Sequence, residues 1–137
     1  MVKFFVISEY SLNPPASGQG RVKIANGPLY ELERVQQLAA VGSLQAWTDS
    51  CDKTIYNLFA GDLAAVADLL QCLRTQDYRD SEWCTNGRNA LAACDAYKLC
   101  RREWVASTGK TMPVEYFLKF AVSKTGQLAL LASCHLS

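Results

Sequence analysis

Apolar side chains recur at helical spacing in the first half of the chain. After Gly27-Pro28, the positions Leu29, Leu32, Val35 and Ala39 lie about one turn apart, and Gly42 follows them. Proline suits the first turn of a helix and glycine suits its end, so the pattern predicts a helix between them. A shorter helix is predicted over 50–59. A third begins at Gly61-Asp62, with an apolar stripe of Leu63, Val66, Leu69, Leu70 and Leu73.

The apolar period changes from 3.6 to 2 in the C-terminal part. Residues 114–122 alternate, with Val114, Tyr116, Leu118, Phe120 and Val122 on one side. Residues 92–104 are predicted as the strand before, and 127–135 as the last strand. The segment 75–88 is polar and predicts a turn-rich loop, whereas 1–10 and 21–25 predict short strands around a loop. The expected fold is α+β, with an N-terminal strand and helices packed on an antiparallel C-terminal β-meander.

The register of the last hairpin decides which side chains meet. If Lys124-Thr125-Gly126 is a three-residue loop, Lys119 lies opposite Leu131, and Lys119 and His135 share one face. A two-residue or four-residue loop would place these two side chains on opposite faces. The sequence leaves these registers open.

Length and composition favour a single domain, 1–137, in which residues 1–27 form an N-terminal strand and loop extension. The chain has 137 residues, half of them hydrophobic, and a net charge of +1. The charge is unevenly distributed: residues 1–96 hold 8 Lys and Arg against 11 Asp and Glu, whereas residues 97–137 hold 6 against 2. A basic C-terminal third fits local contact with a polyanion, although a solvated basic face is an equal alternative.

The sequence predicts a cytoplasmic protein without a membrane segment. The apolar run Phe4-Phe5-Val6-Ile7 is too short for a signal peptide, and no apolar stretch approaches the roughly 18 residues of a membrane helix. The six cysteines include no Cys-x-x-Cys pair and are expected to be reduced. A metal site of Cys94, Cys100 and His135 fits no zinc spacing, so neither a metal nor another cofactor is expected.

The familiar catalytic motifs are missing. Gly109-Lys110-Thr111 resembles the end of a phosphate-binding loop, but Trp104 stands where that loop needs a glycine. No Gly-x-Ser-x-Gly motif supports a hydrolase triad. His135, the only histidine, lies on an apolar strand, and imidazole is the side chain best suited to move protons near neutral pH.

Four segments resemble the MqsR family of messenger-RNA-cleaving toxins, within the RelE-like group of small α+β ribonucleases. VQQLAAVGS at 35–43 resembles the family's first helix, and NLFAGDLAAVADLLQCLRTQDYRDS at 57–81 its central helix with the Asp-Phe-Tyr-Lys-Ser signature. ACDAY at 93–97 is similar to Trp-Gln-Asp-Val-Tyr, and EYFLKFAV with LALLASCHLS to the last hairpin, which ends in Ser-Phe-Lys. The order and spacing of the segments agree over residues 28–137.

The resemblance implies metal-independent cleavage of messenger RNA and a cognate antitoxin protein as partner. The family's functional lysine, glutamine and tyrosine fall on Asp80, Cys94 and Phe117, and its terminal lysine falls on His135. The catalytic candidates are therefore His135, Lys119 and Arg101, with Arg101 preferred to its neighbour because it shares strand parity with Tyr97. The candidates for substrate binding are Arg79, Tyr97, Lys98, Arg102 and Tyr116.

Two functions follow from the sequence. The first is an endoribonuclease toxin, in which His135 moves a proton and the basic side chains hold the phosphate. The second keeps the fold without the chemistry, as a protein that binds RNA or a protein partner, since three of the family's functional positions are altered.

Overall fold

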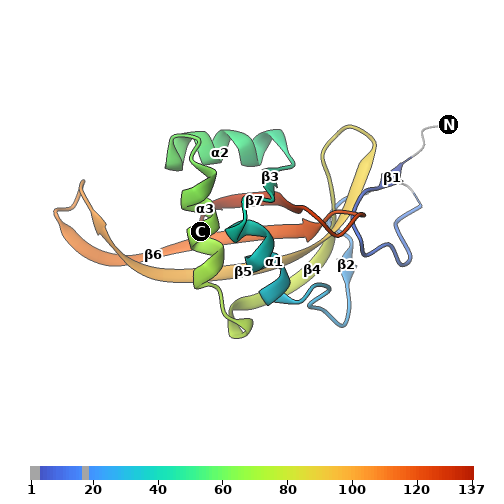
Figure 1. The fold of residues 1–137 in the computed structure, drawn as a ribbon, viewed down its shortest axis with the longest axis horizontal. Coiled ribbons are helices and arrows are strands. Elements are labelled where there is room, and N and C mark those ends of the chain that lie inside the picture. The colour runs from blue at the N-terminus through green and yellow to red at the C-terminus, as the bar shows by residue number, and fades with distance from the viewer. Residues whose placement is uncertain (1–3, 17–18) are drawn as a thin grey trace.

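The fold is an α+β sandwich of a helical layer on a mostly antiparallel sheet (Figure 1). The computed structural model describes residues 4–16 and 19–137. Within them, helices α1 (Leu32–Ala40), α2 (Asp49–Phe59) and α3 (Leu63–Cys72) and a short 3₁₀ turn (Thr75–Asp77) precede the long strands. These strands are β4 (Tyr78–Thr85), β5 (Ala90–Val105), β6 (Lys110–Val122) and β7 (Ala129–Leu136). The α+β class and the C-terminal meander are thus confirmed.

The sheet is larger than the sequence predicts. Its strand order is β2-β4-β5-β6-β7-β3, in which β2 (Lys23–Ile24) and β3 (Leu44–Ala46) form the edges, and β1 (Phe5–Val6) pairs with β5. The β1–β5 and β3–β7 pairs are parallel, whereas the meander is antiparallel. The predicted loop over 75–88 is wrong, because β4 occupies most of it; β3 was also missed. The prediction for residues 1–3 lies outside the described residues.

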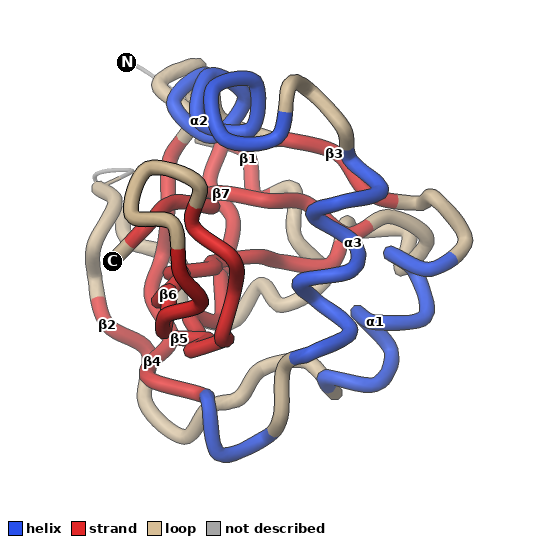
Figure 2. The backbone as a smooth tube through the Cα atoms, turned by 90° about the vertical axis from the view of Figure 1, so that its left-hand side faces the viewer, coloured by secondary structure: helices blue, strands red, loops and turns tan. Residues whose placement is uncertain are grey.

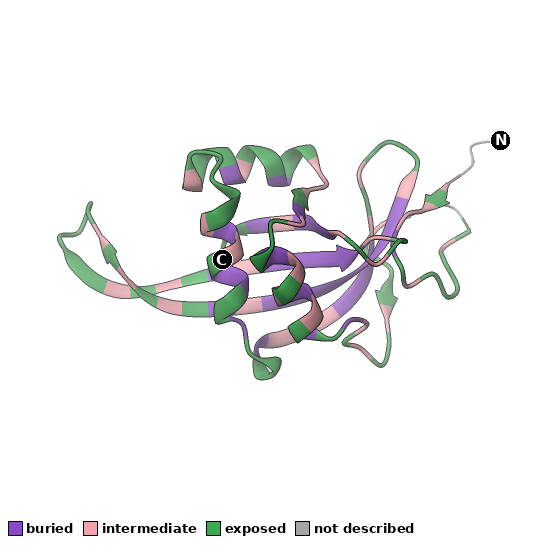
Figure 3. Ribbon diagram, in the orientation of Figure 1, coloured by how far each residue is buried: buried purple, intermediate pink, exposed green. Residues whose placement is uncertain are grey.

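One face of the sheet carries the helices and the hydrophobic core. Helices α1 and α3 pack side by side across it, with α2 beside β7 (Figure 2). The core side chains include Val35, Val66, Leu69, Leu118, Phe120 and Leu131, each fully buried. Buried positions concentrate in the middle of the sheet, and the distal β5–β6 hairpin is mostly exposed (Figure 3). The opposite face, here called the open face, is therefore the part of the sheet available for function.

A buried aspartate ties the start of the helical layer to the sheet. Asp95 in β5 is fully buried and accepts hydrogen bonds from the backbone N–H groups of Leu29 and Tyr30, at 3.0 Å, and from Ser81 Oγ at 2.7 Å. Burial raises the pKa of this carboxyl, and the donated hydrogen bonds oppose the increase. Asp95 therefore acts as a structural anchor.

Candidate nucleic-acid interface

A cavity of about 460 Å³ lies on the open face, where β2, β4, β5, β6 and β7 meet. It is lined by Arg21, Lys23, Arg79, Asp80, Glu82, Lys98, Phe117, Lys119, Ser133, His135 and Ser137, and is called the basic cavity below. Of these described residues, five are Lys or Arg and two are Asp or Glu. Such an excess of positive charge in a concave site favours a polyanionic ligand.

Two further cavities lie on the helical side. One of about 600 Å³ is bounded by β3, α2 and the start of α3, and one of about 340 Å³ lies between α1 and α3. The larger has a single lysine, Lys53, beside Asp52, and neither contains a residue predicted for the site. The basic cavity is smaller than the first of them, but it alone among these three combines a histidine with several cations.

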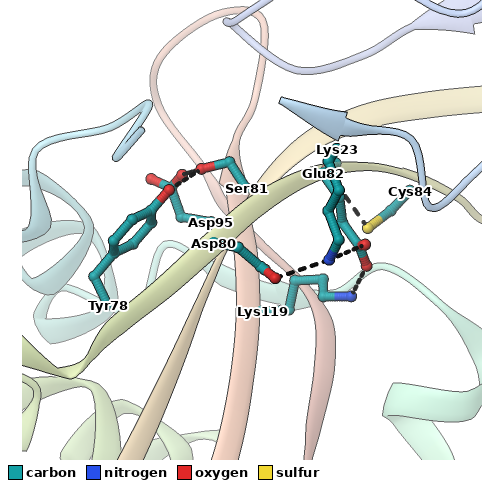
Figure 4. Close-up of polar contacts among 8 residues, drawn as sticks. All are labelled: Lys23, Tyr78, Asp80, Ser81, Glu82, Cys84, Asp95 and Lys119. Carbon is teal, nitrogen blue, oxygen red and sulfur yellow. Dashed lines mark hydrogen bonds and ion pairs between the residues drawn. The ribbon is translucent and has the colours of Figure 1, made fainter. Parts of the chain in front are cut away.

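The floor of the basic cavity is an ion-pair network centred on Glu82 (Figure 4). Glu82 Oε1 pairs with Lys119 Nζ, and Glu82 Oε2 lies 2.9 Å from Lys23 Nζ. Lys23 in turn lies 2.8 Å from Asp80. The side chains of Glu82 and Lys119 are only 5% and 11% exposed, so little water screens their attraction.

The network keeps Glu82 ionised. Burial opposes the charged form, but hydrogen bonds from Lys119 and Lys23 outweigh burial and lower the pKa of this carboxyl below its ordinary value. Hydrogen bonds to Asp80 and Glu82 raise the pKa of Lys23. The Glu82 carboxylate is therefore held between the ammonium groups of Lys23 and Lys119.

His135 is exposed at the rim of the cavity, with one ring nitrogen engaged. Its ring stacks on Phe117 with centroids 5.1 Å apart, and Lys119 Nζ lies 5.4 Å from the centroid of the same Phe117 ring. His135 Nδ1 is 3.0 Å from the carbonyl oxygen of Leu136. Because a carbonyl only accepts, Nδ1 carries the proton in that bond, and Nε2 of the neutral ring is left as a proton acceptor.

A β-bulge places His135 on the same face as Lys119. Ser123 N–H donates to the carbonyl of Leu128, so the connecting loop is one residue longer than the three-residue alternative. A regular hairpin with this four-residue loop would place Lys119 and His135 on opposite faces of the sheet. The register shifts between the pairs Lys119–Ser133 and Phe120–Leu131, which makes Ala132 an extra residue on β7. The two side chains therefore share a face, but through the bulge and not through the three-residue loop for which this was expected, and Phe117, not Glu115, lies opposite His135.

The bulge is supported by the connection between β3 and α2. Thr48 Oγ1 donates to the carbonyl of Ala132 at 2.9 Å, and Trp47 N–H donates to that of Leu131 at 2.8 Å. Thr48 also caps α2, since its hydroxyl accepts from Cys51 N–H. The start of α2 therefore fixes the strand geometry that orients His135.

Four of the eight predicted site residues line the basic cavity. They are Arg79, Lys98, Lys119 and His135. Arg79 is the extra residue of a second irregularity, between the pairs Tyr78–Tyr97 and Asp80–Ala96, and it is exposed. Lys98 is half-buried and lies 3.6 Å from Glu115.

Three predicted residues face the helices instead. Tyr97 is 1% exposed and stacks on Phe120, with centroids 5.3 Å apart. Tyr116 donates its hydroxyl proton to Glu103, and burial with this bond raises its pKa to about 12. Arg101 shares the face of Tyr97, as its parity predicted, and that face is the helical one: its Nε lies 2.7 Å from Glu103, and its Nη1 is 3.8 Å from Cys72 of α3.

The fourth predicted residue that does not line the basic cavity is Arg102, which is exposed farther along the β5–β6 hairpin. In contrast, the sequence did not predict Arg21, Lys23 or Glu82 as site residues. Residues 21 and 23 come from the N-terminal extension, which thus adds an edge strand and also borders the cavity. Glu82 was missed because its strand was read as a loop.

The cysteines do not assemble a metal site in the described chain. Cys94 is fully buried, whereas Cys100 and His135 are exposed. No group of three or more His, Cys, Asp or Glu side chains within 4–16 and 19–137 is arranged to hold a metal ion. In the same residues, no helix has the length and apolar character needed to cross a membrane.

Comparisons with protein families and with curated proteins find no match for the chain. Function must therefore be argued from the basic cavity itself.

Proposed function

We propose that this protein is a metal-independent endoribonuclease of the MqsR type, which cleaves single-stranded messenger RNA in the cytoplasm and is held in check by a cognate antitoxin. The observation that carries the proposal is the convergence of His135, Lys119, Lys98 and Arg79 on one cavity of the open face. A face of the sheet opposite the helices, lined by cations and one proton acceptor, suits a flexible, negatively charged strand.

The chemistry required is transfer of the phosphate from the 5′-oxygen to the adjacent 2′-oxygen. His135 Nε2 takes the proton of the 2′-hydroxyl, whose oxygen attacks phosphorus as the bond to the 5′-oxygen breaks. The leaving oxygen takes a proton from water at the mouth of the cavity. The products are a 2′,3′-cyclic phosphate and a 5′-hydroxyl, and no oxidant or cofactor is needed.

The cations would stabilise the negative charge that develops on the phosphate oxygens in the transition state. Lys119 is held in place by Glu82 and projects beside the Phe117 ring on which His135 stacks, so the base and this ammonium flank the same aromatic side chain. Lys98, opposite Phe117 on β5, adds a second ammonium. Preorganised cations of this kind contribute most where water is scarce, as on the floor of the cavity.

The test uses the purified full-length protein with end-labelled single-stranded RNA in excess chelator. The expected result is cleavage to cyclic-phosphate ends, with a loss of at least about 100-fold in His135→Ala, the usual contribution of a general base. Arg101→Ala, on the helical face, is the matched control and should cleave like the parent. RNA that stays intact with the parent, or equal cleavage by His135→Ala, would refute the endonuclease.

The antitoxin and the growth effect belong to the same proposal. Controlled expression should arrest growth with the parent but not with His135→Ala, and a cognate antitoxin should bind the chain and relieve the arrest. Growth that is unaffected by the parent would argue against a toxin even if RNA is cleaved in vitro.

One observation favours the alternative of RNA binding without cleavage. Glu82 places a carboxylate beside Lys119, where an RNA phosphate would otherwise pair, and reduces the positive charge available for the transition state. Salt-dependent binding by the parent and by His135→Ala, with no cleavage by either, would establish this alternative in place of the first.

A further inference from the structure

The β5–β6 hairpin extends well beyond the helical layer as a curved arm (Figure 1). Its strands stay paired to the end, from Arg101–Val114 to Val105–Lys110, and the outer segment 101–114 is called the arm below. The arm carries Arg101, Arg102 and Lys110 against a single acidic residue, Glu103. It is therefore a basic projection that grows directly out of the strands bearing the basic cavity.

Alternation along β5 puts two arm residues on the cavity side. Arg101 and Glu103 face the helices, because Arg101 contacts Cys72 of α3 and Glu103 accepts the hydroxyl proton of buried Tyr116. Their neighbours Arg102 and Trp104 therefore project from the other side. That side is the open face, since Lys98, which has the same parity, lines the basic cavity.

Trp104 is a large aromatic side chain left in water. It is 66% exposed, whereas Trp83 in the core is 2% exposed. Leaving an indole ring in water forgoes the stabilisation that its burial would supply. On a basic arm in line with a basic cavity, a flat exposed ring has the chemistry that base stacking requires.

We propose that Trp104 is a stacking platform for a base of the single-stranded RNA that lies across the cavity, with Arg102 beside it to pair with a phosphate. The inference rests on the proposed function and extends it by assigning a second contact point outside the cavity. Strand rise places Trp104 about 20 Å from Lys98 along β5, six residues on. A stacked strand rises roughly 3.4 Å per nucleotide, so this span takes at most about six nucleotides, and fewer when the single strand is extended.

The geometry therefore predicts a dependence on RNA length. A dinucleotide can occupy the cavity but is too short to reach Trp104 even when it is extended, whereas a strand of about 15 nucleotides can contact both. A protein partner or a second copy of the chain on the arm would show no such dependence on RNA length.

The experiment measures binding of fluorescein-labelled, fully 2′-O-methylated RNA by anisotropy, so that no cleavage can occur. Trp104→Ala should bind the strand of about 15 nucleotides roughly tenfold more weakly, within the range seen for loss of one stacked base, and should bind the dinucleotide as the parent does. Trp104→Phe should recover most of the affinity. Tyr56→Ala is the matched control, because Tyr56 on α2 is 71% exposed and does not line the basic cavity.

Each other result overturns the inference in an identifiable way. Equal affinity of Trp104→Ala and the parent for the longer strand, or the same loss with both strands, would exclude the platform. A change in oligomeric mass with Trp104→Ala in sedimentation would assign the ring to self-association. The proposed function is judged separately, by cleavage of unmodified RNA. If the parent cleaves RNA but Trp104→Ala does not change binding, only the platform is refuted. If the parent binds RNA through Trp104 but does not cleave it, only the endonuclease is refuted.

Discussion

The buried pair of Glu82 and Lys119 is the feature of the cavity whose energetics are most directly testable. Lys119→Met keeps the apolar stem and removes the ammonium, which leaves Glu82, at 5% exposure, with Lys23 as its remaining ion-pair partner. Removing one member of a buried pair costs about 3–5 kcal/mol when the other charge is left alone. Because Lys23 still holds one carboxylate oxygen at 2.9 Å, the expected loss in the free energy of unfolding is about 2–3 kcal/mol.

Urea and thermal unfolding followed by circular dichroism measure this loss. A domain of this size loses about 4 °C of Tm per kcal/mol, so Lys119→Met should melt roughly 8–12 °C below the parent at neutral pH. Adding Glu82→Gln to Lys119→Met removes the buried charge and should recover at least about 1 kcal/mol, a coupling that shows the two residues act as a pair.

The pH dependence of stability provides an independent test of the contribution of the pair of Glu82 and Lys119. The pKa of Glu82 is lowered in the folded protein from an ordinary value of 4.5, so the pair stabilises the fold above that value and is lost as the pH falls through the lower, folded pKa. Lys119→Met lowers the stability of the protein only while the Glu82 carboxyl is ionised, because only the ionised carboxyl pairs with Lys119. The difference in Tm between the parent and Lys119→Met should therefore be constant near neutral pH and narrow below about pH 4.5.

The matched control is the pair of Lys98 and Glu115, whose side chains are 39% and 47% exposed at 3.6 Å. Lys98→Met should cost no more than about 1 kcal/mol, since exposed ion pairs contribute little. If Lys119→Met is no less stable than Lys98→Met, or if its deficit persists unchanged in acid, the account of the cavity floor is wrong.

Three further predictions concern the anchor, the faces of the sheet and the RNA. Asp95→Ala leaves two buried backbone N–H groups without an acceptor, while the Ser81 hydroxyl keeps its hydrogen bond with Tyr78, so the change should cost about 3–5 kcal/mol in urea unfolding, whereas Asp68→Ala on the exposed side of α3 should cost less than about 0.5 kcal/mol. Lys98→Met should weaken RNA binding several-fold in a filter assay while Arg101→Met leaves it unchanged, because only Lys98 lines the basic cavity; equal effects would place RNA elsewhere. With about four phosphates neutralised, log Kd for RNA should rise with log salt at a slope of roughly 3, and a slope near zero would exclude the basic cavity as the RNA site.

The helices could be predicted from the sequence because their signals are local. Asp62 caps α3 with its side chain, which accepts from Ala64 N–H at 2.9 Å, and Leu69 and Leu70 of the predicted stripe are fully buried. Gly42 follows α1 with a φ of 81°, a conformation that favours glycine. Each signal lies within a few residues of the structure it determines.

Strand β4 could not be predicted, because two of its three buried positions are polar. Ser81 and Glu82 are buried together with Trp83, and their partners lie on other strands: Asp95 for Ser81 and Lys119 for Glu82. A polar side chain that is satisfied across the sheet has the same sequence signature as one in a loop. The floor of the cavity therefore depends on pairings separated by more than a dozen residues, which local patterns do not encode.

Which side chains enter the cavity is decided by two strand irregularities. Strand alternation alone, with the loop that the structure has, would turn His135 toward the helices; the extra residue Ala132 returns it to the open face beside Lys119. The extra residue Arg79 in β4 likewise restores Asp80 and Glu82 to that face after Tyr78, which packs against Tyr97. Because Thr48 and Trp47 bind the carbonyls at the first bulge, the orientation of His135 depends on the start of α2, outside the cavity. A substitution at Thr48 should thus weaken cleavage through the position of the histidine, without touching RNA.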